Sequence, residues 1–477
     1  MILSSIRTVY KENDDERAEE VYKDYLGVRD RRTRVTDPRL SLNEVNEPVF
    51  QRLVVENSSD GDIKLTINDK NTTPSNVLLA KAAQYIREVI RQKAAGSKKY
   101  DVFLLELEEF VRDRIILILV AVGDEADAYL IFETLNDRGL ELSISDLLKN
   151  YIFGRAANRL DIVRKQWQEM AVILGTQDQT QFLRHYWLSK YGVVRERDLY
   201  REMKRLFASQ SAVLRLMTEL RDAADNYAAI SSVDHPTWKE YGTSLRKDLE
   251  SLQLFGLSQF RPLLLAALDT LKEDEIPKLI HMIVVVSMRY SIIGSLGTGN
   301  IEKAYSDAAI GVRDKNAKTA AKIFALLKGI YPDDSRFEAD FAQKEISKAK
   351  LARYVLAAVA NKVQGSKELT ILEDEKVVTL EHIMPKTRSQ EWLQVAGDEE
   401  QYLSYVNRLG NLTLIEREKN RAANASSFLE KKKVAFSRSD ILITKNLSNY
   451  GNWTVTEIDE RQRQLANTAV NIWSLPY

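Results

Sequence analysis

The sequence contains no cysteine. This absence excludes disulfide bonds, thiol nucleophiles and the cysteine-liganded zinc sites that brace many small domains. A chain without disulfides suits a reducing compartment, so we expect a cytoplasmic protein. Its small domains must be held together by packed side chains, aromatic ones above all.

Long hydrophobic runs are also missing. The longest uninterrupted apolar run, Ile115 to Val122, is far shorter than the roughly 20 residues that a membrane helix needs. The comparable segment from Leu279 to Val286 contains His281. We therefore expect no membrane-spanning segment.

The chain has no excess of charge of either sign. Its 69 basic and 69 acidic side chains give a formal net charge of zero. No overall electrostatic field therefore draws the protein to a nucleic acid. Any affinity for DNA must come from a local cluster of charge.

What is present predicts a large, mainly helical protein. With 477 residues, of which 44% are hydrophobic, the chain can bury more than one core. From Asn76 to about Asn361 helical patterns dominate, and Ile115 to Val122 has the β-branched character of a buried strand. We expect a mainly α, multidomain fold: a helical body with few strands, then a carboxy-terminal ββα-metal domain. The expected domains span 1–153, 154–365 and 366–477.

Two short segments near the carboxyl end carry the polar residues of a one-metal nuclease hairpin. In Thr379-Leu-Glu-His-Ile-Met-Pro-Lys386, a carboxylate and an imidazole stand side by side at the end of an apolar run. In Arg408-Leu-Gly-Asn-Leu-Thr-Leu-Ile415, an asparagine heads a second apolar run. We predict that these runs are two strands, and that a helix opens at Asn420 and runs through Phe428 to Phe436.

The residue types fit phosphodiester hydrolysis. This reaction needs a base that activates water, a divalent cation and a group that orients the imidazole. In the predicted arrangement Glu381 and Asn420 offer the hard oxygen ligands that Mg²⁺ or Mn²⁺ prefers, and His382 faces the scissile phosphate. A lone histidine beside a glutamate is more often a structural pair. The strand-strand-helix context with Asn411 and Asn420 favours a catalytic site instead.

Basic residues gather in the same region. They outnumber the acidic residues there, so this part could follow a phosphate backbone although the whole chain is neutral. For the lysine run the alternative is an ordinary solvated helix face. The candidate DNA-binding residues are Arg408, Arg421, Lys431, Lys432 and Lys433.

A capped helix-turn-helix corner is predicted upstream. One helix should end at Asn136, Gly139 can adopt the positive φ that stops a helix, and Ser143 with Asp146 should cap the next helix. The plain interpretation is a structural corner. The functional alternative is that Asn136 and Arg138 line a nucleotide or DNA phosphate site.

These motifs resemble known nucleases. The Glu-His, Asn and Asn series resembles the HNH or His-Me finger nucleases. The run from Thr379 to Trp473, with Tyr405-Val-Asn-Arg-Leu-Gly-Asn-Leu-Thr-Leu414, is similar to the carboxy-terminal domain of GmrSD-type, modification-dependent restriction endonucleases. Phe132-Glu-Thr-Leu-Asn-Asp-Arg-Gly139 and Phe182-Leu-Arg-His-Tyr-Trp-Leu-Ser189 resemble the partner half of that family.

The resemblance implies roles for these residues. His382 would be the general base, Glu381 and Asn420 the metal ligands, and Asn411 the residue that positions the base. Members of this family cut foreign DNA, often modified DNA, under the control of nucleotide hydrolysis.

One departure from the family concerns its nucleotide-binding motif, Asp-Gly-Gln-Gln-Arg, which does not occur in this sequence. No Gly-rich phosphate loop with a Lys-Ser/Thr end replaces it. We expect that the missing portion lies on a companion chain or was lost. The nucleotide-binding residues are therefore unknown, and nucleotide dependence is left open.

Two hypotheses follow from the sequence. The first is a metal-dependent DNA endonuclease of a restriction or phage-defence system. The second is a non-catalytic DNA-binding or regulatory subunit of such a system, in which the hairpin is a remnant. The intact set of Glu381, His382, Asn411 and Asn420 favours the first.

Overall fold

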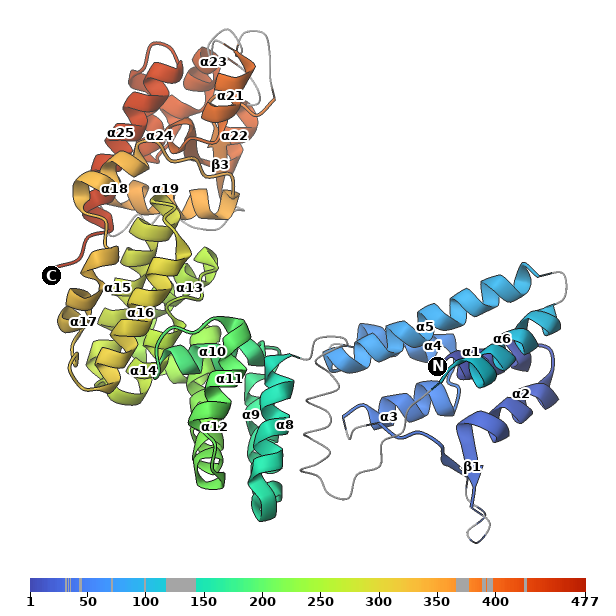
Figure 1. Ribbon diagram of the computed structural model, residues 1–477. Helices are drawn as coiled ribbons and strands as arrows, with labels where there is room; N and C mark the ends of the chain where they lie inside the picture. Colours follow the sequence, from blue (N-terminus) through green and yellow to red (C-terminus); the bar gives the residue numbers. More distant parts are fainter. Residues whose placement is uncertain are drawn as a thin grey trace. The chain divides into compact units, whose positions relative to one another are not determined.

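The structure is a computed structural model that describes residues 1–30, 32, 34, 36–42, 45–69, 72–97, 100–116, 143–365, 377–387, 392, 398–423 and 427–477. Its contacts divide the chain into two compact units, Met1–Ala121 and Val122–Tyr477 (Figure 1). The predicted strand at Ile115–Val122, all but its first two residues, and the predicted corner at Asn136–Gly139 lie outside the described residues.

The described part of the first unit is built from helices and one small hairpin. The strands β1 (Gly27–Arg29) and β2 (Thr36–Pro38) pair antiparallel, Val28 opposite Asp37. The helical elements are α1 (Ile2–Lys11), α2 (Asp15–Val21), η1 (Tyr22–Leu26), α3 (Glu47–Phe50), η2 (Gln51–Val55), α4 (Asp60–Asn68), α5 (Pro74–Ala95) and α6 (Tyr100–Arg114).

Helix α5 is the longest helix in the described part of this unit, and other helices pack against it. Thr73 caps it by accepting a hydrogen bond from the Asn76 N–H, and proline occupies its first turn, where a missing N–H costs nothing. α5 packs against α1 and α4. Two apolar cores result, one around Ile6, Tyr10 and Ile90 and one around Leu53, Ile63 and Ala80.

The second unit begins with a helical body. Ser143 caps its first helix by accepting from the Asp146 N–H, as the sequence predicts. The elements of this body are α8 (Ile144–Ala156), η3 (Ala157–Arg159), α9 (Leu160–Leu174), α10 (Gln179–Leu188), α11 (Glu196–Leu206), α12 (Gln210–Ser231), η4 (Pro236–Tyr241), α13 (Gly242–Phe255), α14 (Arg261–Thr270), η5 (Glu273–Glu275), α15 (Ile276–Ser287), η6 (Met288–Ile293), α16 (Thr298–Arg313), α17 (Ala320–Leu327), η7 (Lys328–Ile330), α18 (Asp334–Phe341) and α19 (Ala349–Gln364).

One stretch of this body, residues 273–293, is long and apolar enough to cross a membrane by length and composition alone. Its most apolar window is 72% buried inside the fold. A helix that is apolar all round and surrounded by other helices is typical of a protein core. We therefore interpret α15 as a core helix.

The carboxy-terminal part of the same unit holds the predicted hairpin. Its elements are β3 (Val378–His382), α21 (Glu399–Val406), η8 (Leu409–Asn411), β4 (Leu412–Glu416), α22 (Arg417–Ala423), α23 (Phe428–Val434), η9 (Phe436–Arg438), α24 (Leu442–Lys445), η10 (Asn446–Asn449) and α25 (Val455–Ile472).

The hairpin is antiparallel, as predicted. Glu381 lies opposite Thr413, and His382 lies opposite Leu412. Because successive side chains of a strand point to opposite faces, the two faces of β4 join different cores. Leu412 and Leu414 pack into the large core of the helical body, whereas Ile415 packs into a smaller core with Trp392 and Trp453.

The fold is mainly helical with few strands, as the sequence predicts. Five aromatic residues are expected to pack the small domain: Trp392, Tyr402, Tyr405, Trp453 and Trp473. Trp392, Tyr402 and Trp453 are buried in its core and Tyr405 packs against it, whereas Trp473 is buried in the core of the helical body instead. The boundaries predicted at 153 and 365 stay predictions. What matters for the site is that the hairpin is packed on both faces, so its end is rigidly held.

Candidate active site

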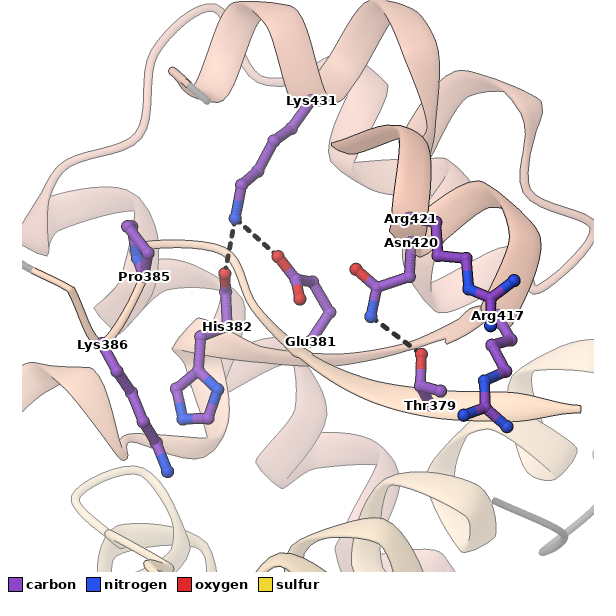
Figure 2. A pocket seen from close by; sticks show the side chains of 9 residues that line it. All are labelled: Thr379, Glu381, His382, Pro385, Lys386, Arg417, Asn420, Arg421 and Lys431. Atoms are coloured by element: carbon purple, nitrogen blue, oxygen red, sulfur yellow. Dashed lines mark hydrogen bonds and ion pairs between the residues drawn. The ribbon is translucent and has the colours of Figure 1, made fainter. Parts of the chain in front are cut away.

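Strand β3 ends in the two residues that the sequence places side by side. Alternation along the strand sends Glu381 and His382 to opposite sides of the backbone. Figure 2 shows the Glu381 carboxylate pointing toward Asn420 and Lys431, while the imidazole of His382 lies across the strand beside Lys386. The two adjacent side chains therefore face different parts of the same pocket.

Glu381 is held by a buried lysine. The Lys431 ammonium donates to Glu381 Oε1 at 2.5 Å and to the backbone oxygens of His382 at 2.9 Å and Ile383 at 3.3 Å. The side chains of Lys431 and Glu381 are 1% and 15% exposed. This buried ion pair ties helix α23 to the end of β3.

Asn420 lies on helix α22, where its amide is oriented by Thr379. The Asn420 Nδ2 donates to Thr379 Oγ1 at 2.8 Å, and the Thr379 hydroxyl donates to the Ile415 backbone oxygen at 3.3 Å. With its nitrogen committed to Thr379, Asn420 turns its Oδ1 toward Glu381 (Figure 2). Two oxygen atoms thus face one another from the hairpin and the helix.

His382 is a neutral imidazole at neutral pH. Burial, together with the positive charges of Lys386 and Lys431, lowers the pKa of His382 to about 4, against an opposing hydrogen bond with the Asn407 side chain. Nε2 is buried and has no hydrogen-bond partner among the described residues. A neutral ring with an unpaired nitrogen suits a proton acceptor.

Asn411 positions the loop that follows His382. This fully buried side chain accepts at Oδ1 from the Met384 N–H at 2.8 Å and donates from Nδ2 to the Met384 oxygen at 2.9 Å and the Val406 oxygen at 3.0 Å. Trp453 Nε1 donates to the same Oδ1 at 3.1 Å. Asn411 therefore acts on the backbone beyond His382, and its side-chain hydrogen bonds to the described residues do not reach the imidazole.

The turn that carries Asn411 is clamped by helix α25. Gln462 Oε1 accepts from the Gly410 N–H at 2.9 Å, and Arg461 NH1 donates to the Gly410 oxygen at 2.6 Å and the Leu412 oxygen at 2.8 Å. The helix lies so close that a side chain at Gly410 would meet the Ile458 backbone oxygen at 2.2 Å. Position 410 therefore requires glycine.

We expect Gly410→Ala to destabilise the carboxy-terminal domain by about 1–3 kcal/mol, because α25 would be pushed from the turn. Urea unfolding followed by tryptophan fluorescence measures this change. The control is Gly451→Ala, since a side chain there would meet no atom within 4 Å. Equal stability of the two variants would contradict the close packing at Gly410.

Glu381, His382 and Asn420 line one open pocket of about 630 Å³. Glu381 is the one carboxylate among the described residues that line it. Four of the lining side chains are cationic. The described residues that line it are Thr379, Glu381, His382, Pro385, Lys386, Arg417, Asn420, Arg421 and Lys431.

Two of the predicted DNA contacts are used inside the fold instead. Arg408 is buried, where it donates to Asp459 at 2.8 Å and Gln462 at 3.1 Å. Lys431 is buried against Glu381. Spacing along the chain cannot tell a buried arginine or lysine from an exposed one, because both have long apolar stems that pack well. Both charges are paired inside the fold, and a DNA-binding role for Arg408 and Lys431 stays a prediction.

The other predicted DNA contacts lie nearer the surface. Lys432 is half-buried and donates to the Tyr450 backbone oxygen at 2.8 Å. Lys433 and Arg421 are exposed, and Arg421 lines the pocket. A DNA-binding role for Arg421, Lys432 and Lys433 stays a prediction.

The helix of the predicted ββα arrangement begins earlier than expected. Helix α22 starts at Arg417, directly after β4, so Asn420 lies within it rather than at its first turn. The helix also does not run on to Phe436, because Ser427 caps a new helix, α23, by accepting from the Glu430 N–H. Capping by serine offers the backbone an alternative to a continuous helix.

Sequence reasoning missed three contributors: Thr379, Lys386 and Asn407. Thr379 and Lys386 stand at the two ends of the motif that holds Glu381 and His382, and Asn407 lies four residues before Asn411. No spacing rule singles out Asn407. Arg417 belongs to the basic residues that gather in this region of the sequence, and it lines the pocket.

The donor set fits a divalent cation of the magnesium type. Such ions take oxygen ligands, keep several waters and are often bound through one or two carboxylates together with phosphate oxygens. Glu381 and the Asn420 amide oxygen provide two hard donors on one side of the pocket. No cluster of three or more His, Cys, Asp or Glu side chains occurs in the described part of the chain. The described residues therefore offer no site of the kind that surrounds a zinc ion with protein ligands.

Comparison with known families gives two matches. The model for the C-terminal domain of GmrSD restriction endonucleases matches residues 331–468, which include the whole pocket. The model for the N-terminal domain of the GmrSD restriction endonuclease matches residues 3–153. A search of curated proteins finds no match.

Proposed function

We propose that this chain, which belongs to the GmrSD family of restriction endonucleases, hydrolyses DNA phosphodiester bonds with the help of one divalent cation. The observation that carries the proposal is that Glu381 and Asn420 turn oxygen atoms toward each other in a basic pocket that also contains His382. DNA cleavage in phage defence is the activity that the family name supports.

His382 is proposed as the general base. Its neutral ring accepts a proton from water at Nε2, the nitrogen without a partner among the described residues. The water oxygen bonds to phosphorus and one phosphorus–oxygen ester bond breaks. Because the attacking and leaving oxygens lie on opposite sides of phosphorus in an in-line displacement, the base and the cation ligands need not share one face of β3.

Glu381 and Asn420 would hold Mg²⁺ or Mn²⁺. When bound, such a cation neutralises the charge that develops on the phosphate and on the leaving oxygen. Thr379 keeps the Asn420 amide turned so that its oxygen, not its nitrogen, is offered. Asn411 keeps the loop after His382 in place through Met384.

The cationic rim supplies the contact with DNA. Lys386, Arg417 and Arg421 are exposed and line the pocket around Glu381 and His382. Guanidinium and ammonium groups at these positions can bind backbone phosphates without reading the base sequence.

The test is cleavage of plasmid and phage DNA, modified and unmodified, by purified protein with Mg²⁺, Mn²⁺ or EDTA, with and without nucleotide. We expect Asn420→Ala to cut about 10–100-fold more slowly than wild type, by analogy with the loss of other metal-site contacts. The loss should shrink as the metal concentration rises, because the variant binds the cation more weakly.

The matched control is Asn467→Ala, an exposed asparagine on α25 outside the pocket. Its rate should equal that of wild type. Cleavage that continues in EDTA would overturn the metal dependence. DNA binding without cleavage, under every condition and on every DNA, would favour the non-catalytic subunit.

A further inference from the structure

The charge around Glu381 is unusual for a cation site. Among the described residues that line the pocket, four side chains are positive, Lys386, Arg417, Arg421 and Lys431, against the single carboxylate of Glu381. Sites that bind Mg²⁺ or Ca²⁺ tightly by themselves usually gather several carboxylates. By its fixed charge this pocket attracts phosphates and repels a free divalent cation.

Lys431 differs from the other three cations because it cannot leave the site freely. Its side chain is 1% exposed, and its ammonium is held by Glu381 Oε1 and by the backbone oxygens of His382 and Ile383. Figure 2 shows the ammonium next to the carboxylate that faces Asn420. The positive charge of Lys431 therefore already neutralises Glu381, the carboxylate that is proposed as a cation ligand.

We propose that Lys431 neutralises Glu381 so that the pocket binds a divalent cation tightly only together with a DNA phosphate. This inference rests on the proposed function, since it takes Glu381 and Asn420 as the cation ligands. It adds that cation and DNA bind cooperatively, and that the buried lysine is the cause.

The physical argument is electrostatic. A divalent cation beside Glu381 would gain the attraction of one carboxylate and suffer the repulsion of an ammonium that lies 2.5 Å from the same carboxylate. In a partly buried site, water screens these interactions less than at an open surface. Phosphate groups of DNA add the negative charge that attracts the cation and that the pocket itself does not provide. By linkage, the factor by which DNA tightens cation binding equals the factor by which the cation tightens DNA binding.

The gain for the enzyme is that the site stays empty of tightly held metal until DNA arrives. A lysine whose only role is structural would behave differently. Its removal would let Glu381 lose its position and would weaken cation binding or leave it unchanged. The sign of the change therefore separates the two roles.

The experiment measures Mn²⁺ binding by the full chain, from the electron paramagnetic resonance signal of unbound Mn²⁺. All proteins carry His382→Ala so that DNA stays intact during the titration. Binding is measured with and without a short DNA duplex of the kind that wild type cuts. Lys431→Met, which keeps the length and the apolar stem but removes the charge, is compared with Lys431→Arg.

We expect DNA to tighten Mn²⁺ binding at least about tenfold when Lys431 is present. Without DNA, Lys431→Met should bind Mn²⁺ at least about tenfold more tightly than the parent, and DNA should then add less. Lys431→Arg keeps the charge and should behave like the parent. The control Lys445→Met removes an exposed lysine outside the pocket and should leave Mn²⁺ binding unchanged.

The proposal is overturned if Lys431→Met, shown to be folded by its thermal melting, binds Mn²⁺ no more tightly than the parent. If that variant does not fold, the parent decides the matter alone, since an affinity for Mn²⁺ that DNA leaves unchanged overturns the proposal equally. Glu381→Gln separates this failure from that of the proposed function. Mn²⁺ binding that survives Glu381→Gln would show that Glu381 is no ligand, and both proposals would then fall.

Discussion

The His382→Ala enzyme should cut DNA about 10²–10⁴-fold more slowly than wild type, which is the usual contribution of a general base. The imidazole is neutral, and Nε2 has no partner among the described residues. No other neutral imidazole lines the pocket in the described part of the chain. Single-turnover cleavage at saturating protein and metal measures the chemical step without contributions from product release.

Two further measurements tie this loss to the base. Raising the metal concentration should not rescue His382→Ala, whereas it should rescue Asn420→Ala in part. Since the pKa of His382 is lowered to about 4, its basic form is complete at neutral pH. The wild-type rate should therefore show no inflection near the ordinary histidine pKa, and protonation of His382 should reduce it only as the pH falls toward 4.

The matched control is His281→Ala. His281 lies on α15 and pairs with Asp248 at 3.2 Å, outside the pocket. Its removal should leave the cleavage rate unchanged. If His382→Ala cuts as fast as this control, the base must be sought elsewhere and the interpretation of the β3 end as a catalytic site is wrong.

Replacing Arg461 by methionine should destabilise the carboxy-terminal domain by about 3–5 kcal/mol, because several buried carbonyl groups lose their donor together. Arg461 is fully buried, and burial lowers its pKa to about 10, so it remains charged at neutral pH. Besides the Gly410 and Leu412 oxygens, it contacts Thr413 Oγ1 at 3.2 Å. These contacts join α25 to the start of β4.

Chemical unfolding followed by tryptophan fluorescence measures this loss. Arg463→Met is the control, because Arg463 lies exposed on the same helix, where a change is expected to cost less than about 0.5 kcal/mol. The loss of Arg461 should also slow cleavage at temperatures where the protein is still folded, since Asn411 and the loop after His382 depend on the same turn. If the Arg461→Met and Arg463→Met proteins are equally stable, the contacts between Arg461 and the start of β4 do not stabilise the domain.

Much of the local structure follows from the chain itself. The helices α5, α6 and α8 were predictable from apolar spacing and from Thr73 and Ser143 as caps. The two strands around Glu381 and Asn411 were predictable as short apolar runs, and their pairing from the spacing of the motif. The helices are decided by neighbours within a few residues, where backbone geometry and capping chemistry dominate.

The break between α22 and α23 shows where local reasoning ends. Residues 420–436 have acceptable helical spacing, yet Ser427 caps a second helix that turns Lys431 back toward β3. That turn is stabilised by a partner fifty residues away, Glu381. No window of sequence contains both members of such a pair.

By itself, the sequence determined the mainly helical class, the hairpin and the identity of Glu381, His382 and Asn420 as neighbours of one another. Only the tertiary structure decided which charges are free. Arg408, Lys431 and Arg461 are buried, and Arg421 and Lys386 reach the pocket. The reason is that burial of a long cationic side chain depends on acceptors supplied by distant segments: Asp459 for Arg408, Glu381 for Lys431 and the turn carbonyls for Arg461.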